Sequence, residues 1–273
     1  MALAHELFGK VGSDEPVGSG QQQSPGHRVY RGNPATGRPL EYFGGMPRPT
    51  FSTTLTPPEL AGYVTRLVAN YLPDGAERKV NLKPQVRAAL ERLEHCFSRI
   101  HRKYYTIDDR VTFDHLNSDH MAAFLYFLGN TIWRASGDTG LPTRLFYVNK
   151  AMNGIDLYFS VPMPDIFLLV HPVGTVVGSA TYGDYLVLYQ NCTVGADAGI
   201  YPTFGEGVVL FSRTSVLGNS TIGDDVVFAA NSFIVNADVP SNSVVVGQFP
   251  GHRILPNTVP VRDRLFKSTP QGG

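Results

Sequence analysis

Two side chains in the second half of the chain have the types and the spacing of an acid–base pair. His171 lies fifteen residues after Asp156. A neutral imidazole, with an ordinary pKa of about 6.5, can accept a proton from a hydroxyl near neutral pH. A carboxylate on the other ring nitrogen fixes the tautomer and stabilises the imidazolium that forms. The pair therefore predicts activation of a hydroxyl, with His171 as general base and Asp156 as the group that orients it.

The segment that carries these residues repeats every six positions. Five consecutive units each begin with a large apolar residue: Leu210, Val216, Ile222, Phe228 and Ile234. The fifth place of the same units is mostly small: Thr214, Ser220, Val226, Ser232 and Asp238. Six residues on each flat side and three sides per turn predict a parallel β-solenoid. Because Asp156 lies about one coil before His171, stacking of coils is expected to bring the two side chains together.

The chain divides into four predicted parts. Residues 1–55, which are rich in Gly, Ser, Gln and Pro, are expected to form a flexible extension because they cannot bury enough apolar surface. Residues 56–154 predict a helical domain. Residues 155–256 predict the solenoid, in which an irregular insertion at 196–207 separates two blocks of the repeat. Residues 257–273 are expected to form a C-terminal tail.

Capping signals and apolar spacing predict four helices. Thr56-Pro57-Pro58-Glu59 combines an N-cap, a proline in the first turn and a capping-box glutamate, so a helix begins there. Apolar residues at helical spacing indicate a second helix within 86–104 and a third that starts near Ser118. A fourth is predicted at about 142–153. The apolar stripes of the first two helices are expected to form ordinary core or oligomer contacts.

Composition excludes several classes of partner. The chain has 273 residues, 23 Lys and Arg, 23 Asp and Glu, and 17% charged residues, so it has no excess of cations for phosphates or anionic lipid. We therefore expect neither a nucleic-acid partner nor a membrane partner, and a small-molecule ligand instead. The two cysteines, Cys96 and Cys192, have no metal-type spacing and cannot form a disulfide framework. A reducing, cytoplasmic location fits this usage.

Three short motifs resemble those of a known family. Ile155-Asp156-Leu157, the run from His171 to Gly178 and the run from Leu188 to Gly195 are similar to elements of the serine O-acetyltransferase-like hexapeptide-repeat acetyltransferases. The resemblance covers roughly residues 108–256. It implies an α+β fold in which an N-terminal helical region precedes a left-handed parallel β-helix. It also implies an acetyl-CoA-dependent O-acetyltransferase, with acetyl-CoA as co-substrate, direct transfer, and the roles given above for His171 and Asp156.

Further residues acquire expected roles. Backbone N–H groups around Gly195 and Ala196 are candidates to receive the developing oxyanion. The resemblance implies that acetyl-CoA lies in a groove between neighbouring subunits, near the main chain of Ser212 and Ala230, with Arg253 facing a phosphate. It therefore implies a homotrimer or a dimer of trimers, and no metal.

The sequence departs from the family where the acceptor is expected. The family has Asp directly before the catalytic His and an Arg-His-Pro triplet after the insertion, whereas this chain has Val170 and Ile200-Tyr201-Pro202. A charged amino-acid headgroup would lose partners there, and a buried charge without a partner is unfavourable. Asp109, Asp114 and Tyr201 are candidates for the acceptor pocket. The acceptor therefore stays open between an amino acid and the oxygen or nitrogen of a sugar, a sugar nucleotide or another metabolite precursor.

Two other functions compete with this interpretation. A group of acidic and histidine side chains invites a metal site: Asp108, Asp109, Asp114, His115, Asp119 and His120. No metal motif emerges in it, and helix capping explains most of the group. A carbonic-anhydrase-like solenoid would need three histidines, whereas the repeat contains His171 alone. The alternative without catalysis is a trimeric β-helix scaffold, which predicts no binding of CoA.

Overall fold

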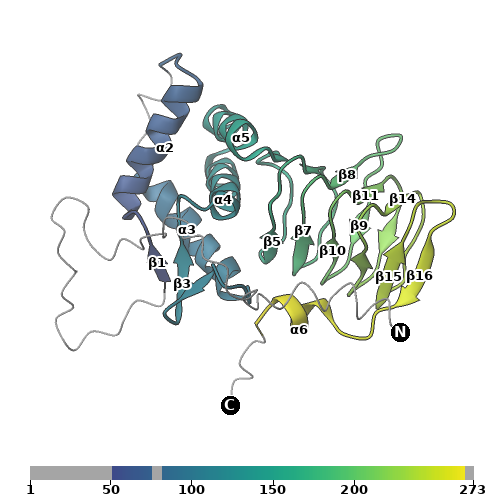
Figure 1. Cartoon of the computed structure of the whole chain (residues 1–273). Helices are drawn as coiled ribbons and strands as arrows, with labels where there is room; N and C mark the ends of the chain where they lie inside the picture. Colours follow the sequence, from purple (N-terminus) through teal and green to yellow (C-terminus); the bar gives the residue numbers. More distant parts are fainter. Residues whose placement is uncertain (1–50, 76–81, 268–273) are drawn as a thin grey trace, which may run out of the picture. The chain divides into compact units, whose positions relative to one another are not determined.

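The computed structural model describes residues 51–75 and 82–267 (Figure 1). Contacts divide the chain into residues 1–49 and residues 50–273, and only the second unit contains described residues. Nearly all of the predicted extension therefore lies outside the described residues. Within the described ranges, none of the helices combines the length and the apolar character needed to cross a bilayer.

A small sheet opens the described part. Strand β1 (Phe51–Thr53) pairs in parallel with β3 (Arg110–Phe113), and β2 (Thr106–Ile107) pairs with β3 in antiparallel orientation. Strand β1 falls inside the stretch predicted to be a flexible extension, so the ordered chain begins earlier than predicted. The reason is a partner about sixty residues away, which no local pattern could indicate.

Four longer helices follow the predicted order. They are α2 (Pro57–Tyr71), α3 (Lys83–Ser98), α4 (Ser118–Ser136) and α5 (Gly140–Asn153). The capping box at Thr56 and Glu59 is present, as the sequence predicts. Helix α4 packs against both α3 and α5, and its buried residues lie on all of its faces. It is therefore the central element of the helical region.

The rest of the described chain forms a parallel solenoid with three faces (Figure 1). The first face contains β5 (Phe167–Leu169), β7 (Leu186–Leu188), β10 (Val209–Leu210), β13 (Val227–Phe228) and β15 (Ser243–Val246). The second contains β4 (Asp156–Leu157), β6 (Val176–Val177), β8 (Thr193–Gly195), β11 (Ser215–Leu217) and β14 (Phe233–Val235). The third contains β9 (Thr203–Phe204) and β12 (Thr221–Ile222), with a bridge from Ile222 to Val239.

Burial follows the hexad pattern. The five leading residues, from Leu210 to Ile234, are at most 1% exposed. The small fifth-place residues Thr214, Ser220 and Ser232 are at most 2% exposed, whereas Asp238 in the last unit is exposed. The predicted fold class, a helical region followed by a β-solenoid, is therefore confirmed. The predicted insertion is too long, because Thr203 and Phe204 already belong to β9.

The described part of the predicted C-terminal tail, residues 257–267, contains a short helix and packs on the rest of the chain. After β16 (Arg253–Pro256), which pairs with β15 in antiparallel orientation, the chain forms α6 (Val261–Leu265). Phe266 is 2% exposed and bridges to Ile100 at the end of α3. The segment therefore returns to the helical region, because an apolar side chain at its end can be buried there.

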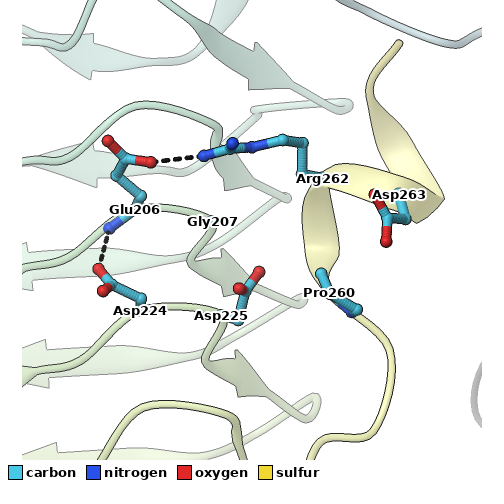
Figure 2. A pocket seen from close by; sticks show the side chains of 7 residues that line it. All are labelled: Glu206, Gly207, Asp224, Asp225, Pro260, Arg262 and Asp263. Carbon is cyan, nitrogen blue, oxygen red and sulfur yellow. Dashed lines mark hydrogen bonds and ion pairs between the residues drawn. The ribbon is translucent and has the colours of Figure 1, made fainter. Parts of the chain in front are cut away.

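A hollow of about 370 Å³ lies between α6 and the solenoid (Figure 2). It is lined by Glu206, Gly207, Asp224, Asp225, Pro260, Arg262 and Asp263. Arg262 forms an ion pair with Glu206, and the Val261 N–H donates to Asp225 Oδ1 at 2.9 Å. These acidic side chains fasten α6 to the coils, so the hollow is a junction between elements and lies away from the predicted site.

Candidate active site

His171 lies on an elongated corner of the solenoid. The ladder aligns Leu169 with Leu188 and Val176 with Thr193. Val176 comes seven residues after Leu169, whereas Thr193 comes five residues after Leu188, so the first corner has two additional residues. The His171 side chain is 79% exposed there. The corner thus presents the imidazole to solvent, where a substrate can reach it.

A carboxylate from the helical region contacts this corner. The backbone N–H of His171 donates to Asp119 Oδ2 at 3.1 Å, and His171 Nδ1 lies 3.7 Å from the same oxygen. The Asp119 side chain is 16% exposed. Asp119 Oδ1 is buried and has no hydrogen-bond partner among the described residues. Asp119 therefore belongs to the site, although the sequence assigned it only to helix capping.

Asp119 is placed by the first turn of α4. Asn117 is the N-cap of this helix, and its side chain accepts from the N–H groups of Asp119 and His120, at 3.0 and 3.3 Å. An acidic residue is favoured in a first helical turn because the free N–H groups carry partial positive charge. The helix signal near Ser118 predicts this turn, but nothing local to it shows that the turn meets the solenoid.

The predicted pairing of Asp156 with His171 is not seen among the described residues. Asp156 lies on β4 and aligns with Val176 on β6, so it is one coil away as predicted. Its carboxylate, however, lies 2.5 Å from Lys150 Nζ, on α5. The physical reason is the longer corner, which carries His171 five residues away from the residue that stacks on Asp156. The role predicted for Asp156 stays a prediction.

A buried histidine supports the start of α4. His120 is 0% exposed, and its Nδ1 accepts from the Asp114 N–H at 3.2 Å. The rings of Phe97 and Tyr105 lie 4.9 and 4.4 Å from the imidazole, centroid to centroid. Burial lowers the pKa of His120 to about 4, so this histidine is neutral at physiological pH. It acts as an uncharged core residue directly beside Asp119.

The residues assigned to acetyl-CoA occupy the corner that carries His171. Leu169, Leu210 and Phe228 align along the first face. His171, Ser212 and Ala230 each lie two residues after one of these positions, so they form a row at one corner. The two additional residues of the first coil displace His171 from strict register with the other two. Neighbouring strands are about 4.8 Å apart, so the three steps from the coil of His171 to that of Ala230 span about 14 Å.

The other candidates, Arg253, Gly195 and Ala196, lie on or beside two different faces of the solenoid. Arg253 is exposed and pairs with Val246 on β15, at the far end of the first face. Gly195 ends β8 on the second face, where its carbonyl accepts from the Gly218 N–H at 3.1 Å, and Ala196 is exposed. The structure therefore keeps both residues at the surface, and their roles stay predictions.

The three acceptor candidates are spread over different elements. Asp109 is exposed in the β2–β3 turn, with φ of 61°. Asp114 Oδ1 accepts from the Leu116 N–H at 2.9 Å, so this carboxylate organises its own loop. Tyr201 lies against Gly178, in the coil that carries His171, where an added Cβ would come within 2.6 Å of the tyrosine ring. The described ranges contain no group of three or more metal-ligating side chains.

Sequence comparisons find curated relatives for part of the chain. No family model matches the chain. A serine acetyltransferase of Synechococcus elongatus is 32% identical over 126 residues, which cover 44% of this chain and 51% of that protein. One of Staphylococcus xylosus is 34% identical over 110 residues, which cover 38% and 50%. This chain is similar, over part of its length, to serine acetyltransferases. It spans about half the length of the curated relatives it matches.

Solved structures share the fold of this chain. A serine acetyltransferase from Vibrio cholerae superposes with a TM-score of 0.58 at 19% identity, over 75% of this chain and 83% of that one. One from Neisseria gonorrhoeae, in complex with serine, gives 0.56 at 20% identity, over 72% and 83%. The fold of this chain, helices followed by a β-solenoid, is therefore that of these structures.

Proposed function

We propose that the protein is an acetyl-CoA-dependent O-acetyltransferase that acetylates a hydroxyl of a small molecule. The supporting observation is the single row at one corner: an exposed imidazole at His171, followed by Ser212 and Ala230 in later coils. The sequence similarity to serine acetyltransferases supports the same chemistry. Acetyl-CoA would lie along this row, with its thioester at the end nearest His171.

The proposed mechanism is direct transfer. His171 Nδ1 faces Asp119, so Nε2 is the nitrogen available to the acceptor hydroxyl. The neutral ring accepts the hydroxyl proton while the hydroxyl oxygen forms a bond to the thioester carbonyl carbon. Backbone N–H groups near Gly195 are proposed to stabilise the oxyanion. Breaking of the carbon–sulfur bond then releases CoA, and the imidazolium returns its proton to the thiolate.

Serine is the first acceptor to test, because it is the substrate that the relatives are named for. The loop before β9 favours a second candidate, a less charged acceptor such as a sugar hydroxyl. Ile200 and Tyr201 are 51% and 40% exposed in this loop, so they offer apolar and phenolic surface. A sugar face can pack on such surface, whereas a carboxylate finds no cation in either side chain.

A thiol-release assay tests the proposal. Purified protein, with acetyl-CoA, is offered serine, other amino acids, sugars and sugar nucleotides. We expect His171→Ala to lower kcat by about 10²-fold or more, the usual contribution of a general base. His101→Ala, at an exposed histidine after α3, is the matched control and should keep wild-type activity. The proposal is wrong if no acceptor raises CoA release above the background, or if His171→Ala is fully active.

The assembly and the location are further parts of the proposal. A homotrimer, alone or paired into a dimer of trimers, would place a second subunit beside the row that starts at His171, and sedimentation at several concentrations measures it. A cytoplasmic location is proposed from the cysteine usage. Cys96 and Cys192 are both buried and free, which a reducing compartment preserves.

A further inference from the structure

We propose that Asp119 is a positioning residue for His171 and that it acts through the main chain, by accepting the His171 N–H. This inference rests on the proposed function, because it gives the general base a fixed direction. It adds a second carboxylate, Asp119, to the one that the sequence suggested, Asp156. The relevant contact joins the first turn of α4 to the first corner of the solenoid.

The backbone of His171 needs an external partner. Its φ is 48°, in the left-handed region that residues other than glycine rarely adopt. The next residue is Pro172, and a residue before proline is driven towards extended conformations. The corner therefore holds His171 in a conformation that its sequence disfavours. A hydrogen bond of 3.1 Å from its N–H to Asp119 Oδ2 opposes relaxation of this corner.

The ring is a weaker point of contact than the main chain. His171 Nδ1 lies 3.7 Å from Asp119 Oδ2, beyond hydrogen-bond distance, and the ring is largely exposed. An ion pair in solvent is screened and contributes little. The backbone N–H of His171 donates to the same Asp119 Oδ2 at 3.1 Å. This corner therefore requires a hydrogen-bond acceptor more than it requires a negative charge.

Asp119 is itself held firmly. Its N–H donates to the Asn117 side chain at 3.0 Å, and its side chain is mostly buried. The next residue, His120, is enclosed by aromatic rings in the core. A fixed acceptor at the end of a central helix can hold a corner of the neighbouring solenoid in one geometry. The Asp156 carboxylate, by contrast, pairs with Lys150 on α5.

Three variants test the inference in the thiol-release assay. Asp119→Ala removes the acceptor, Asp119→Asn keeps an acceptor oxygen without the charge, and Asp165→Asn, at an exposed carboxylate before β5, is the matched control. We expect Asp119→Ala to lower kcat by about tenfold, with KM for acetyl-CoA changed by less than about twofold. Asp119→Asn should recover kcat to within about threefold of wild type. Full activity of Asp119→Ala, or an Asp119→Asn variant as impaired as Asp119→Ala, would overturn the inference.

A second measurement is independent of activity. Labelling with ¹⁵N-histidine gives amide signals for the eight histidines of the full chain, and the signal lost in His171→Ala identifies His171. Hydrogen exchange of this amide should become about tenfold faster in Asp119→Ala and should stay near the wild-type rate in Asp119→Asn. Unchanged exchange in a folded Asp119→Ala protein overturns the inference alone. An inactive wild type with the expected exchange pattern overturns the proposed function alone.

Discussion

Acidification should destabilise the protein through His120. This histidine is buried at the start of α4, accepts from the Asp114 N–H and lies against Phe97 and Tyr105. Burial lowers its pKa to about 4, and the nearby Asp114 carboxylate only partly opposes this effect. In the unfolded chain the same group titrates at about 6.5. The unfolded state therefore binds a proton more readily than the folded state does.

The sign and the size of the effect follow from these two pKa values. Above about pH 6.5 the ring is neutral in both states, and the stability contribution is complete. As the pH falls from 6.5 towards 4, only the unfolded state gains a proton, so the free energy of unfolding decreases. Between pH 7.5 and pH 5 the loss amounts to about 2 kcal/mol, and it approaches about 3 kcal/mol below pH 4.

Urea unfolding at pH 7.5, 6.5, 5.5 and 5.0 measures this loss, with the fluorescence of Trp133 and far-ultraviolet circular dichroism as probes. His120→Asn removes the titrating ring. Between pH 7.5 and pH 5, the free energy of unfolding of this variant should therefore fall by about 2 kcal/mol less than that of wild type. His101→Asn, at an exposed position, should keep the wild-type dependence. If wild type and His120→Asn lose the same free energy between pH 7.5 and 5, the buried neutral histidine is not the cause.

Two substitutions test the packing around the site and the C-terminal segment. Gly174 has φ of 76°, and an added Cβ would lie 2.3 Å from Asn191 Oδ1. Gly174→Ala should therefore lower the free energy of unfolding, measured by thermal unfolding, by about 2 kcal/mol. Gly137 also has a positive φ, of 70°, but it has open space around it, so Gly137→Ala should lower the free energy of unfolding by about 1 kcal/mol. Equal losses in the two variants would contradict the predicted clash. Phe266→Ala should lower the free energy of unfolding by about 3 kcal/mol, because it leaves a cavity at a buried position beside Tyr185. An unchanged melting temperature would show that Phe266 does not anchor the C-terminal segment.

The periodic part of the molecule could be predicted from the sequence. Each leading residue from Leu210 to Ile234 enters the core because the hexad repeats the same backbone geometry in each coil. The cap at Thr56 could be predicted as well, since its partners lie within four residues. In both cases the information is local, or is repeated at a fixed interval, so one chain suffices to find it.

Contacts between unlike elements could not be predicted in this way. The contact of Asp119 with His171 joins residues 52 positions apart, and neither residue has a neighbour that indicates the other. Stacking indicated Asp156 instead, because the hexad has no place for the two additional residues of the first corner. The return of Phe266 to Ile100 was missed for the same reason: an apolar residue in a short segment indicates burial but not its location.

The antiparallel strand β16 has a consequence for self-association. Parallel coils end in exposed N–H and C=O groups, and such an edge can template the addition of further chains as in a fibril. Here β16 reverses direction and occupies the edge of β15, while α4 and α5 contact β5 and β4 at the opposite end (Figure 1). Strand β16 therefore removes the free edge of the first face, and the helices occupy its other end, so this face offers no strand edge for end-to-end addition of another chain.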